Sequence, residues 1–303
     1  MESLFITGGS GFVGRRLLAA IDPGRFGELR WLSRDPAGRA PRTAPVPARA
    51  VRGDINVPES YRALLDPGVT VLHLAAATGK AGPALQRRVN VDGTRTLLQE
   101  CARAGVRRVL HVSSIAAKFP EKKHYPYARA KEEGEALVRA SGLPHVILRP
   151  TIVAGPGSPV LAGLGRLASL PVLPVFGDGR TRVQPLHVDE LVRMMLAVLA
   201  GDRFRGETLE IGGASIVTIE DLLLRLRRLL GRHGRRVIHL PLRPLMPLLA
   251  AVEKLLGGRL PLSAGQLYSF RYDGVAENRA PREHLEPRWG DIDAMLADSL
   301  AHE

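Results

Sequence analysis

The chain of 303 residues is long enough to form one large domain or two modest ones. Hydrophobic residues make up 45% of it and charged residues 24%, a globular composition that excludes disorder or a fibrous repeat as a description of the whole chain. The single cysteine, Cys101, excludes an intramolecular disulfide framework and a zinc site built from cysteines alone.

The 43 lysines and arginines outnumber the 30 acidic residues and give a formal net charge of +13. Such a charge can attract an anionic partner, such as a phosphate-rich ligand, nucleic acid or an acidic membrane face. The arginines are scattered through different segments, however, which favours a solvated basic surface over a single binding patch. Since only 5% of the residues are aromatic, we expect no nucleic acid among the partners.

Charged residues interrupt every apolar stretch before the roughly 20 residues that a membrane span needs. The N-terminus carries Glu2 and runs directly into a glycine-rich turn, unlike a secretory signal. We therefore expect a cytoplasmic protein. The apolar stretch 241–262, flanked by arginine and lysine, has two interpretations: it rests on a membrane or partner surface, or it completes a substrate-binding lobe.

Over the first 150 residues, short apolar runs typical of strands alternate with longer amphipathic stretches typical of helices. We expect strands at 4–7, 29–33, 50–53, 70–75, 108–112 and 145–149, and helices at 12–21, 83–104 and 125–141. This alternation predicts right-handed crossovers and a parallel sheet with helices on both faces. Residues 1–150 are therefore predicted to form a doubly wound α/β domain.

The pattern changes after Arg149-Pro150, where turn-forming residues cluster at 155–159 and 171–174. Beyond them we expect a helix at 188–200, a strand at 209–211, a helix at 218–230 capped by Thr218, and a strand at 237–240. Residues 151–303 are predicted to form a smaller C-terminal substrate-binding lobe, partly interleaved with the first domain. The segment 39–49, rich in arginine, proline and alanine, is predicted to be a loop.

A glycine-rich turn, Thr7-Gly8-Gly9-Ser10-Gly11-Phe12-Val13-Gly14, stands between the first strand and the first helix. Its glycines allow a sharp turn, bring backbone N–H groups near a pyrophosphate and let the helix approach the strand closely. The positive end of the helix then faces the phosphates. The turn therefore predicts a dinucleotide site formed by Gly8, Gly9, Ser10, Gly11, Phe12, Val13 and Gly14.

The G-x-x-G-x-x-G spacing resembles that of the short-chain dehydrogenase/reductase superfamily, and this resemblance implies a Rossmann-type fold with NAD or NADP as cofactor. An acidic residue at the end of the second strand would hold the ribose hydroxyls of NAD. Here Ser33 and Arg34 stand at that place, and both suit a 2′-phosphate. We therefore expect a preference for NADP, while the next residue, Asp35, keeps NAD as the alternative.

Other segments follow the order of the superfamily: Gly53-Asp54-Ile55, His73-Leu74-Ala75-Ala76 and Asn90-Val91-Asp92-Gly93-Thr94. The resemblance implies that the carboxylate of Asp54 contacts the adenine and that small residues let a strand end lie against the cofactor. The cofactor contacts expected from these segments, together with the end of the sixth strand, are Asp54, Ile55, Leu74, Ala75, Ala76, Asn90 and Pro150.

Tyr127 and Lys131 have the Tyr-x-x-x-Lys spacing of the same superfamily. On a helix, residues four apart project from one face, and a nearby ammonium stabilises a phenolate. We expect Tyr127 to exchange a proton with the substrate, and Lys131 to tune it and hold the nicotinamide ribose. Ser114, at the end of the fifth strand and 13 residues before Tyr127, is expected to bind the substrate oxygen.

Two neighbours are rivals for these roles. Ser113 replaces Ser114 if the register is off by one residue, and Tyr125 precedes an arginine, Arg129, at the position where Tyr127 has its lysine. Arginine cannot be tuned in the same way, so Tyr127 is preferred. No metal is expected, because His73, His111 and His187 lack metal-ligand spacing and are interpreted as polar residues at strand ends.

In the second half, 153–157, 177–179 and 184–190 resemble extended members of the superfamily, the NAD-dependent epimerase/dehydratase type. Within it, the chain is similar to the branch of the Rossmann-type accessory subunit of respiratory complex I and its bacterial relatives. Two hypotheses follow. The first is an NAD(P)-dependent oxidoreductase or epimerase-like enzyme for a small carbonyl or alcohol substrate, in which Arg182 binds an anionic group or forms a surface salt bridge. The second is a non-catalytic nucleotide-binding scaffold of a membrane or respiratory assembly.

Overall fold

The structure, a computed structural model, describes residues 2–22, 25–35, 48–79, 81–232, 234, 236–242, 263–277, 279–285 and 290–301. Its centre is a parallel sheet of seven strands in the order β11-β6-β5-β4-β1-β2-β3. The strands are β1 (Glu2–Thr7), β2 (Phe26–Ser33), β3 (Ala48–Arg52), β4 (Val69–His73), β5 (Arg108–Val112), β6 (His145–Pro150) and β11 (Glu207–Ile211). The predicted doubly wound α/β architecture is confirmed.

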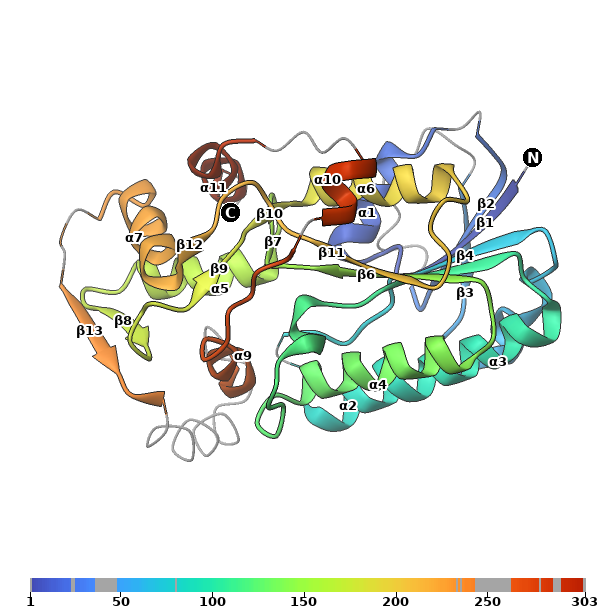
Figure 1. Cartoon of the computed structure of the whole chain (residues 1–303), viewed down its shortest axis with the longest axis horizontal. Helices are drawn as coiled ribbons and strands as arrows, with labels where there is room; N and C mark the ends of the chain where they lie inside the picture. The colour runs from blue at the N-terminus through green and yellow to red at the C-terminus, as the bar shows by residue number, and fades with distance from the viewer. Residues whose placement is uncertain are drawn as a thin grey trace.

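Helices cover both faces of this sheet (Figure 1). On one face lie α1 (Phe12–Ala20) and α6 (Val188–Ala200), and on the other α2 (Pro83–Arg87), α3 (Thr94–Ala104) and α4 (Pro126–Ala140). Successive residues of a strand point to opposite faces, so Leu4 and Ile6 of β1 join the core under α1 and α6, whereas Phe5 joins the core with α3 and α4. Burial on both faces explains why the central strands are apolar runs without polar alternation.

The helix predicted over 83–104 is helical over its whole length, but its central turns are not α-helical. A π-helical stretch, Arg88–Gly93, separates α2 from α3. In this wider turn the Asn90 amide donates to Ala77 O at 2.9 Å and its oxygen accepts from Ala77 N at 2.8 Å. Such a bulge often marks a functional site, and this one supports the chain segment that follows β4.

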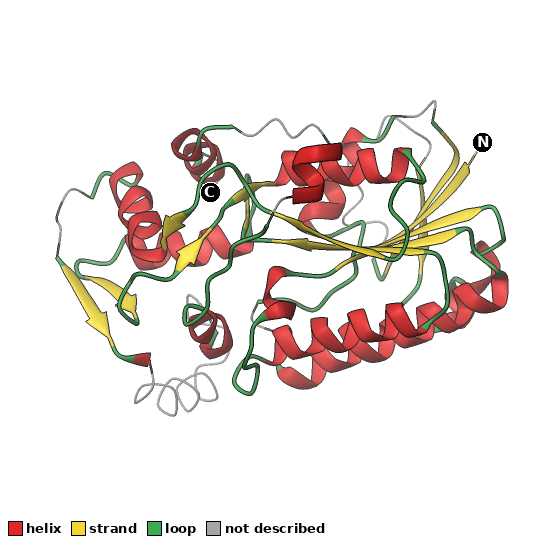
Figure 2. Cartoon of the chain, viewed as in Figure 1, coloured by secondary structure: helices red, strands yellow, loops and turns green. Residues whose placement is uncertain are grey.

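Two elements expected in the second region belong to the main sheet layer. Strand β11 pairs with β6, and α6 packs against α1. Most other elements of the second half, drawn mainly on the left of Figure 2, form a second core. They are β7 (Val153–Ala154), α5 (Pro159–Ala168), β8 (Leu173–Phe176), β9 (Arg182–Val183), β12 (Val217–Thr218), α7 (Ile219–Leu229), β13 (Val237–Leu240), α9 (Ala264–Ser269) and α11 (Ile292–Leu300). By contrast, α10 (Arg279–His284) lies against β11, and β10 (Leu186–His187) contributes Leu186 to the first core. The division at residue 150 stays a prediction.

The Thr218 hydroxyl accepts a hydrogen bond from Asp221 N at 3.1 Å, as the predicted cap of α7 requires. The loop expected at 39–49 lies outside the described residues, apart from its last two residues. Those two were predicted wrongly, because Ala48 and Arg49 pair with β2. The apolar stretch 241–262 likewise lies outside the described residues, except for 241 and 242. Within the described part of the chain, no helix is long and apolar enough to cross a membrane.

Candidate active site

The glycine turn closes the gap between β1 and α1 and needs its glycines for steric reasons. Gly8 has φ +79°, and a Cβ there would lie 2.6 Å from Ala75 N. A Cβ on Gly14 would lie 2.3 Å from Gly8 O. At the N-terminus of α1, Gly11 is the N-cap and no side chain caps it, so the first N–H groups of the helix stay available for an anion. This cradle fits the diphosphate of a dinucleotide.

A cleft runs from this turn to the ends of β2 and β3. Its lining includes Ser10, Ser33, Arg34, Asp54, Ile55, Leu74, Ala75 and Ala76, which are predicted cofactor contacts, whereas Asp35 is not among the described lining residues. Burial opposes ionisation of Asp54, but hydrogen bonds from Asn56 and the charges of Arg34 and Arg88 outweigh it and lower the pKa of that carboxyl. The cleft thus brings together most of the residues predicted to contact the adenosine part of the cofactor.

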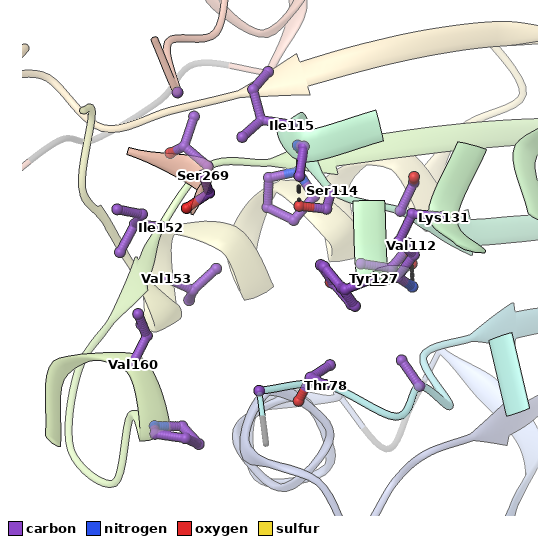
Figure 3. A pocket seen from close by; sticks show the side chains of 18 of the residues that line it. Thr78, Val112, Ser114, Ile115, Tyr127, Lys131, Ile152, Val153, Val160 and Ser269 are labelled. Atoms are coloured by element: carbon purple, nitrogen blue, oxygen red, sulfur yellow. Dashed lines mark hydrogen bonds between the residues drawn. The ribbon is translucent and has the colours of Figure 1, made fainter. Parts of the chain in front are cut away.

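On the other side of the turn, a cavity of about 350 Å³ joins the glycines to the predicted catalytic residues. Figure 3 shows Ser114, Tyr127 and Lys131 in this cavity. Gly8, Gly11, Phe12, Val13 and Gly14 line it together with Leu74, Ala76, Ser114, Tyr127, Lys131 and Pro150. Residues from the first 14 positions and from the fifth strand onward therefore meet in one cavity. Two predicted cofactor contacts line neither cavity among the described residues: Gly9 packs against the Trp31 ring, and Asn90 holds Ala77.

Ser114, Tyr127 and Lys131 form the polar centre of the cavity. Burial raises the pKa of Tyr127 to about 12, and a hydrogen bond from Ser114 opposes this rise. The Lys131 Nζ lies 6.0 Å from the centre of the Tyr127 ring and donates to Val112 O at 2.8 Å. Burial lowers the pKa of Lys131 to about 8, against the opposing effect of the Glu135 carboxylate. The structure thus brings the three predicted residues together.

The rival serine has another partner. The Ser113 hydroxyl donates to Glu135 Oε1 at 2.6 Å, whereas Ser114 Oγ accepts from Ala116 N at 3.2 Å and donates its own proton to Tyr127 in the cavity. Tyr125 lines the same cavity, and burial raises its pKa. Its helical neighbour Arg129 is exposed and pairs with Glu133 at 3.8 Å instead, so this arginine does not support a phenolate at Tyr125.

Glu135, which the sequence analysis did not identify, is a buried neighbour of the three predicted catalytic residues. It is 1% exposed and binds Arg149 at 2.8 and 2.7 Å and Arg139 at 2.8 Å. Burial opposes its ionisation, but these hydrogen bonds and that from Ser113 lower its pKa. The available signal was its position, since Tyr127, Lys131 and Glu135 follow each other at intervals of four residues on α4.

The buried histidines beneath the cavity are neutral. His73 Nδ1 lies 2.7 Å from Thr7 Oγ1 and its Nε2 lies 2.9 Å from Thr94 Oγ1, and burial lowers its pKa to about 3. The ring of His111 lies 5.0 Å from that of His73, and burial places its pKa well below the usual value. His187 Nδ1 caps α6 by accepting from Asp189 N at 3.2 Å. None of the three belongs to a metal-binding cluster in the described part of the chain.

Arg182 does not bind an anion in the cavity, contrary to one of the two expectations for it. Its guanidinium pairs with Asp273 at 2.7 Å on the surface, 91 residues away in the sequence. The remaining cavity lining was not predicted from the sequence: Thr78, Phe119, Gln266, Ser269, Phe270 and Tyr272 are among it. No motif marks these residues, because they come from a connecting loop and from α9 and the turn after it.

Comparison with known proteins gives relatives with enzyme names. The model of the NAD dependent epimerase/dehydratase family matches residues 4–212. A ceramide reductase of Caulobacter vibrioides is 33% identical over 193 residues, which are 63% of this chain and 59% of that protein. A dTDP-glucose 4,6-dehydratase of Streptomyces niveus is 30% identical over 277 residues, 80% of this chain and 81% of that protein.

A solved structure of a similar enzyme resembles the chain over nearly its whole length. DesIV, a dTDP-glucose 4,6-dehydratase from Streptomyces venezuelae with NAD and TYD bound, superposes with a TM-score of 0.74 at 27% identity and covers 99% of this chain and 96% of its own. The cofactor supported by the family and by this neighbour is NAD(H). Since the family model covers more than half of the chain, the protein belongs to the NAD dependent epimerase/dehydratase family.

Proposed function

We propose that the protein is an NAD(P)-dependent oxidoreductase that transfers a hydride between the nicotinamide and a carbonyl or secondary alcohol, with Tyr127 as acid and base. The observation that carries the proposal is that Ser114, Tyr127 and Lys131 line the cavity that begins at the Gly8–Gly14 turn. When bound, the cofactor supplies or accepts the hydride. The chain's own residues then have to hold the substrate oxygen and move its proton.

In the oxidative direction, with the hydride of the carbinol carbon taken up by a bound cofactor, the substrate hydroxyl would give its proton to the Tyr127 phenolate and become the oxygen of a ketone. Ser114 donates a hydrogen bond to the substrate oxygen, and the Lys131 ammonium stabilises the Tyr127 phenolate that accepts the proton. The raised pKa of Tyr127 makes this support necessary, because at about 12 the phenol alone ionises too rarely near neutral pH.

NADP is the cofactor form that we propose the protein prefers. Arg34 lines the adenosine cleft at the end of β2, and its charge acts on Asp54 within that cleft. A guanidinium at this position can pair with a 2′-phosphate through charge-assisted hydrogen bonds. Ser33 Oγ accepts from Asp35 N at 3.2 Å, so the serine hydroxyl can still donate to the same phosphate. NAD remains the alternative.

An epimerase or dehydratase reaction would begin with the same hydride transfer. The named relatives therefore support hydride transfer, but they do not distinguish oxidoreduction from epimerisation or dehydration. The scaffold hypothesis and the complex I branch are less favoured, because the relatives described above carry enzyme names. The complete trio in an open cavity also has no use in a scaffold. A cytoplasmic location and any contact with a membrane or respiratory assembly remain expectations from the sequence.

The test is a fluorescence titration with NADPH and NADH, followed by a screen of alcohols and ketones for cofactor turnover. Tyr127→Phe should lower kcat/KM by about 100-fold or more while the dissociation constant for NADPH stays within about threefold. Tyr125→Phe is the matched control and should retain most of the turnover. Failure to bind either cofactor, or equal turnover by Tyr127→Phe and the parent protein, would contradict the proposal.

A further inference from the structure

The part of the cavity beyond the catalytic residues is mainly apolar. Its walls come from the 3₁₀ turn η4 (Ile115–Lys118) and the residue after it, from β7 with the residue before it, from the start of α5, from β9, and from the turn after α9. Their apolar lining residues are Ile115, Phe119, Ile152, Val153, Val160, Val183 and Phe270. In the view of Figure 3, Tyr127 lies between Lys131 on one side and the wall of Ile152, Val153 and Val160 on the other.

Three hydroxyl groups on these walls already donate to the backbone. Ser158 donates to Val153 O at 2.7 Å, Ser269 donates to Gln266 O at 2.6 Å, and Thr151 donates to Gln184 O. Their protons are therefore not available to a ligand unless a backbone carbonyl loses its partner, which is costly in a buried position. The hydrogen-bonding groups left for a substrate are those of Ser114 and Tyr127, with Thr78, Tyr125 and Gln266 as further polar residues in the lining.

Charge is also nearly absent from this cavity. Lys131 is the one charged side chain among the described residues that line it, although the chain carries a net charge of +13. Cations on neighbouring segments pair with carboxylates instead: Arg182 with Asp273 at 2.7 Å, Lys118 with Glu210 at 2.7 Å, and Arg271 with Glu121 at 3.6 Å. A diphosphate bound in this part of the cavity would meet no described arginine, and burying an unpaired anion is strongly unfavourable.

From this lining we infer that the substrate is an uncharged secondary alcohol or ketone carried on a largely hydrocarbon body. Its oxygen lies at Ser114 and Tyr127, and its hydrocarbon lies against Ile152, Val153 and Val160. The inference rests on the proposed function and specifies its substrate class. It distinguishes this chain from an enzyme that takes a sugar nucleotide, because such a substrate needs donors and cations along the same walls.

The test is made by binding, so that it does not depend on turnover. Tyr127→Phe loaded with NADP⁺ is titrated calorimetrically with 2-butanol, 2-hexanol and 2-octanol, and separately with UDP-glucose. Burying a methylene is worth ~0.8 kcal/mol, so the affinity should rise about fourfold for each added CH₂. UDP-glucose should show no binding. Tighter binding of UDP-glucose than of 2-octanol, an affinity that does not rise with chain length, or no binding by any of the alcohols would overturn the inference.

A matched pair of variants locates the hydrocarbon. Val160→Thr puts a hydroxyl into the apolar wall with little change of side-chain shape. It should raise the dissociation constant of 2-octanol by about fivefold or more. Val172→Thr makes the same change at a side chain that is 42% exposed and outside the cavity, and should have no effect. Equal effects of the two variants would place the alcohol elsewhere. Turnover of UDP-glucose that disappears in Tyr127→Phe would overturn the substrate class and leave the proposed function standing.

Discussion

Glu135 lies one turn after Lys131 on α4, and its buried carboxylate is the charge that offsets the loss of solvation of the Lys131 ammonium. Burial lowers the pKa of Lys131 to about 8, and Glu135 acts in the opposite direction. The same carboxylate is fixed by Arg149, Arg139 and Ser113. A network below the cavity thus keeps the lysine charged at neutral pH, although no member of that network except Lys131 and Ser113 lines the cavity.

Glu135→Gln should therefore change the pH profile of the reaction. Without the carboxylate the pKa of Lys131 falls below about 8, so the alkaline limb of kcat/KM moves to lower pH. The substitution also leaves the Arg149 charge, 19% exposed, without its main partner, and we expect a loss of stability on the order of 2 to 3 kcal/mol. Turnover against pH and urea unfolding measure the two effects.

Glu133→Gln is the matched control on the same helix. Glu133 is partly exposed and pairs with Arg87 at 3.1 Å on the surface, so neither the pH profile nor the stability should change measurably. An alkaline limb that is the same in Glu135→Gln and in the parent protein would show that Glu135 does not act on Lys131.

The two adjacent serines should respond differently to substitution. Ser114→Ala removes the donor at the substrate oxygen and should lower kcat/KM by about 100-fold. Ser113→Ala should retain most of the turnover but lower the free energy of unfolding by about 1 to 3 kcal/mol, because the buried Glu135 loses a hydrogen bond of 2.6 Å. Steady-state kinetics and urea unfolding of both variants test the assignment. The opposite pattern would shift the substrate-binding role to Ser113.

The cofactor preference should depend on Arg34. A charge-assisted hydrogen bond contributes about 1.5 to 3 kcal/mol. Arg34→Ala should therefore lower the affinity for NADPH about ten- to a hundredfold and leave the affinity for NADH nearly unchanged. Asp35→Ala is the control, since Asp35 is not among the described residues lining the adenosine cleft. Dissociation constants for both nucleotides, taken from fluorescence titrations, measure the ratio. A parent protein that binds NADH more tightly than NADPH would make the preference for NADP wrong.

The sequence predicts those features of the structure that are defined by residues close together in the chain. The helix Val188–Ala200 and the strand Val237–Leu240 have the predicted bounds, because an apolar pattern and flanking polar residues define each of them. The glycine turn and the Tyr-x-x-x-Lys pattern are likewise defined by residues close together in the sequence. Residues of both line the cavity. Their roles in binding and catalysis remain predictions.

Contacts between distant segments could not be predicted in this way. The pairing of β11 with β6 and of Arg182 with Asp273 joins residues about 60 and 91 positions apart, and no periodic pattern encodes such partners. For the same reason the apolar wall contributed by Phe270, and with it the substrate class, emerges only in the folded chain.

The buried His111 predicts how stability responds to acid. Neither of its ring nitrogens has a hydrogen-bond partner in the described part of the chain, and the groups that act on it are His73, Lys131, Arg139 and His145. Burial, together with the charges of Lys131 and Arg139, holds its pKa well below 6.5, so the folded protein keeps the ring neutral at a pH where the unfolded chain binds a proton. The stability that depends on the neutral His111 ring is therefore fully present above about pH 6.5. It is lost progressively as the pH falls below that value.

His111→Leu removes both the unpaired nitrogens and the titration. At pH 7 it should stabilise the fold by about 1 kcal/mol, and between pH 7 and pH 5 its advantage over the parent protein should grow by about 2 kcal/mol. Urea unfolding at the two pH values measures this difference. The control is Val172→Leu at an exposed position, which removes no titratable group and should give a difference that does not change with pH. If the advantage of His111→Leu stayed constant from pH 7 to pH 5, the ring would have to be protonated in the folded protein as well, and the neutral histidine pair beneath the cavity would be disproved.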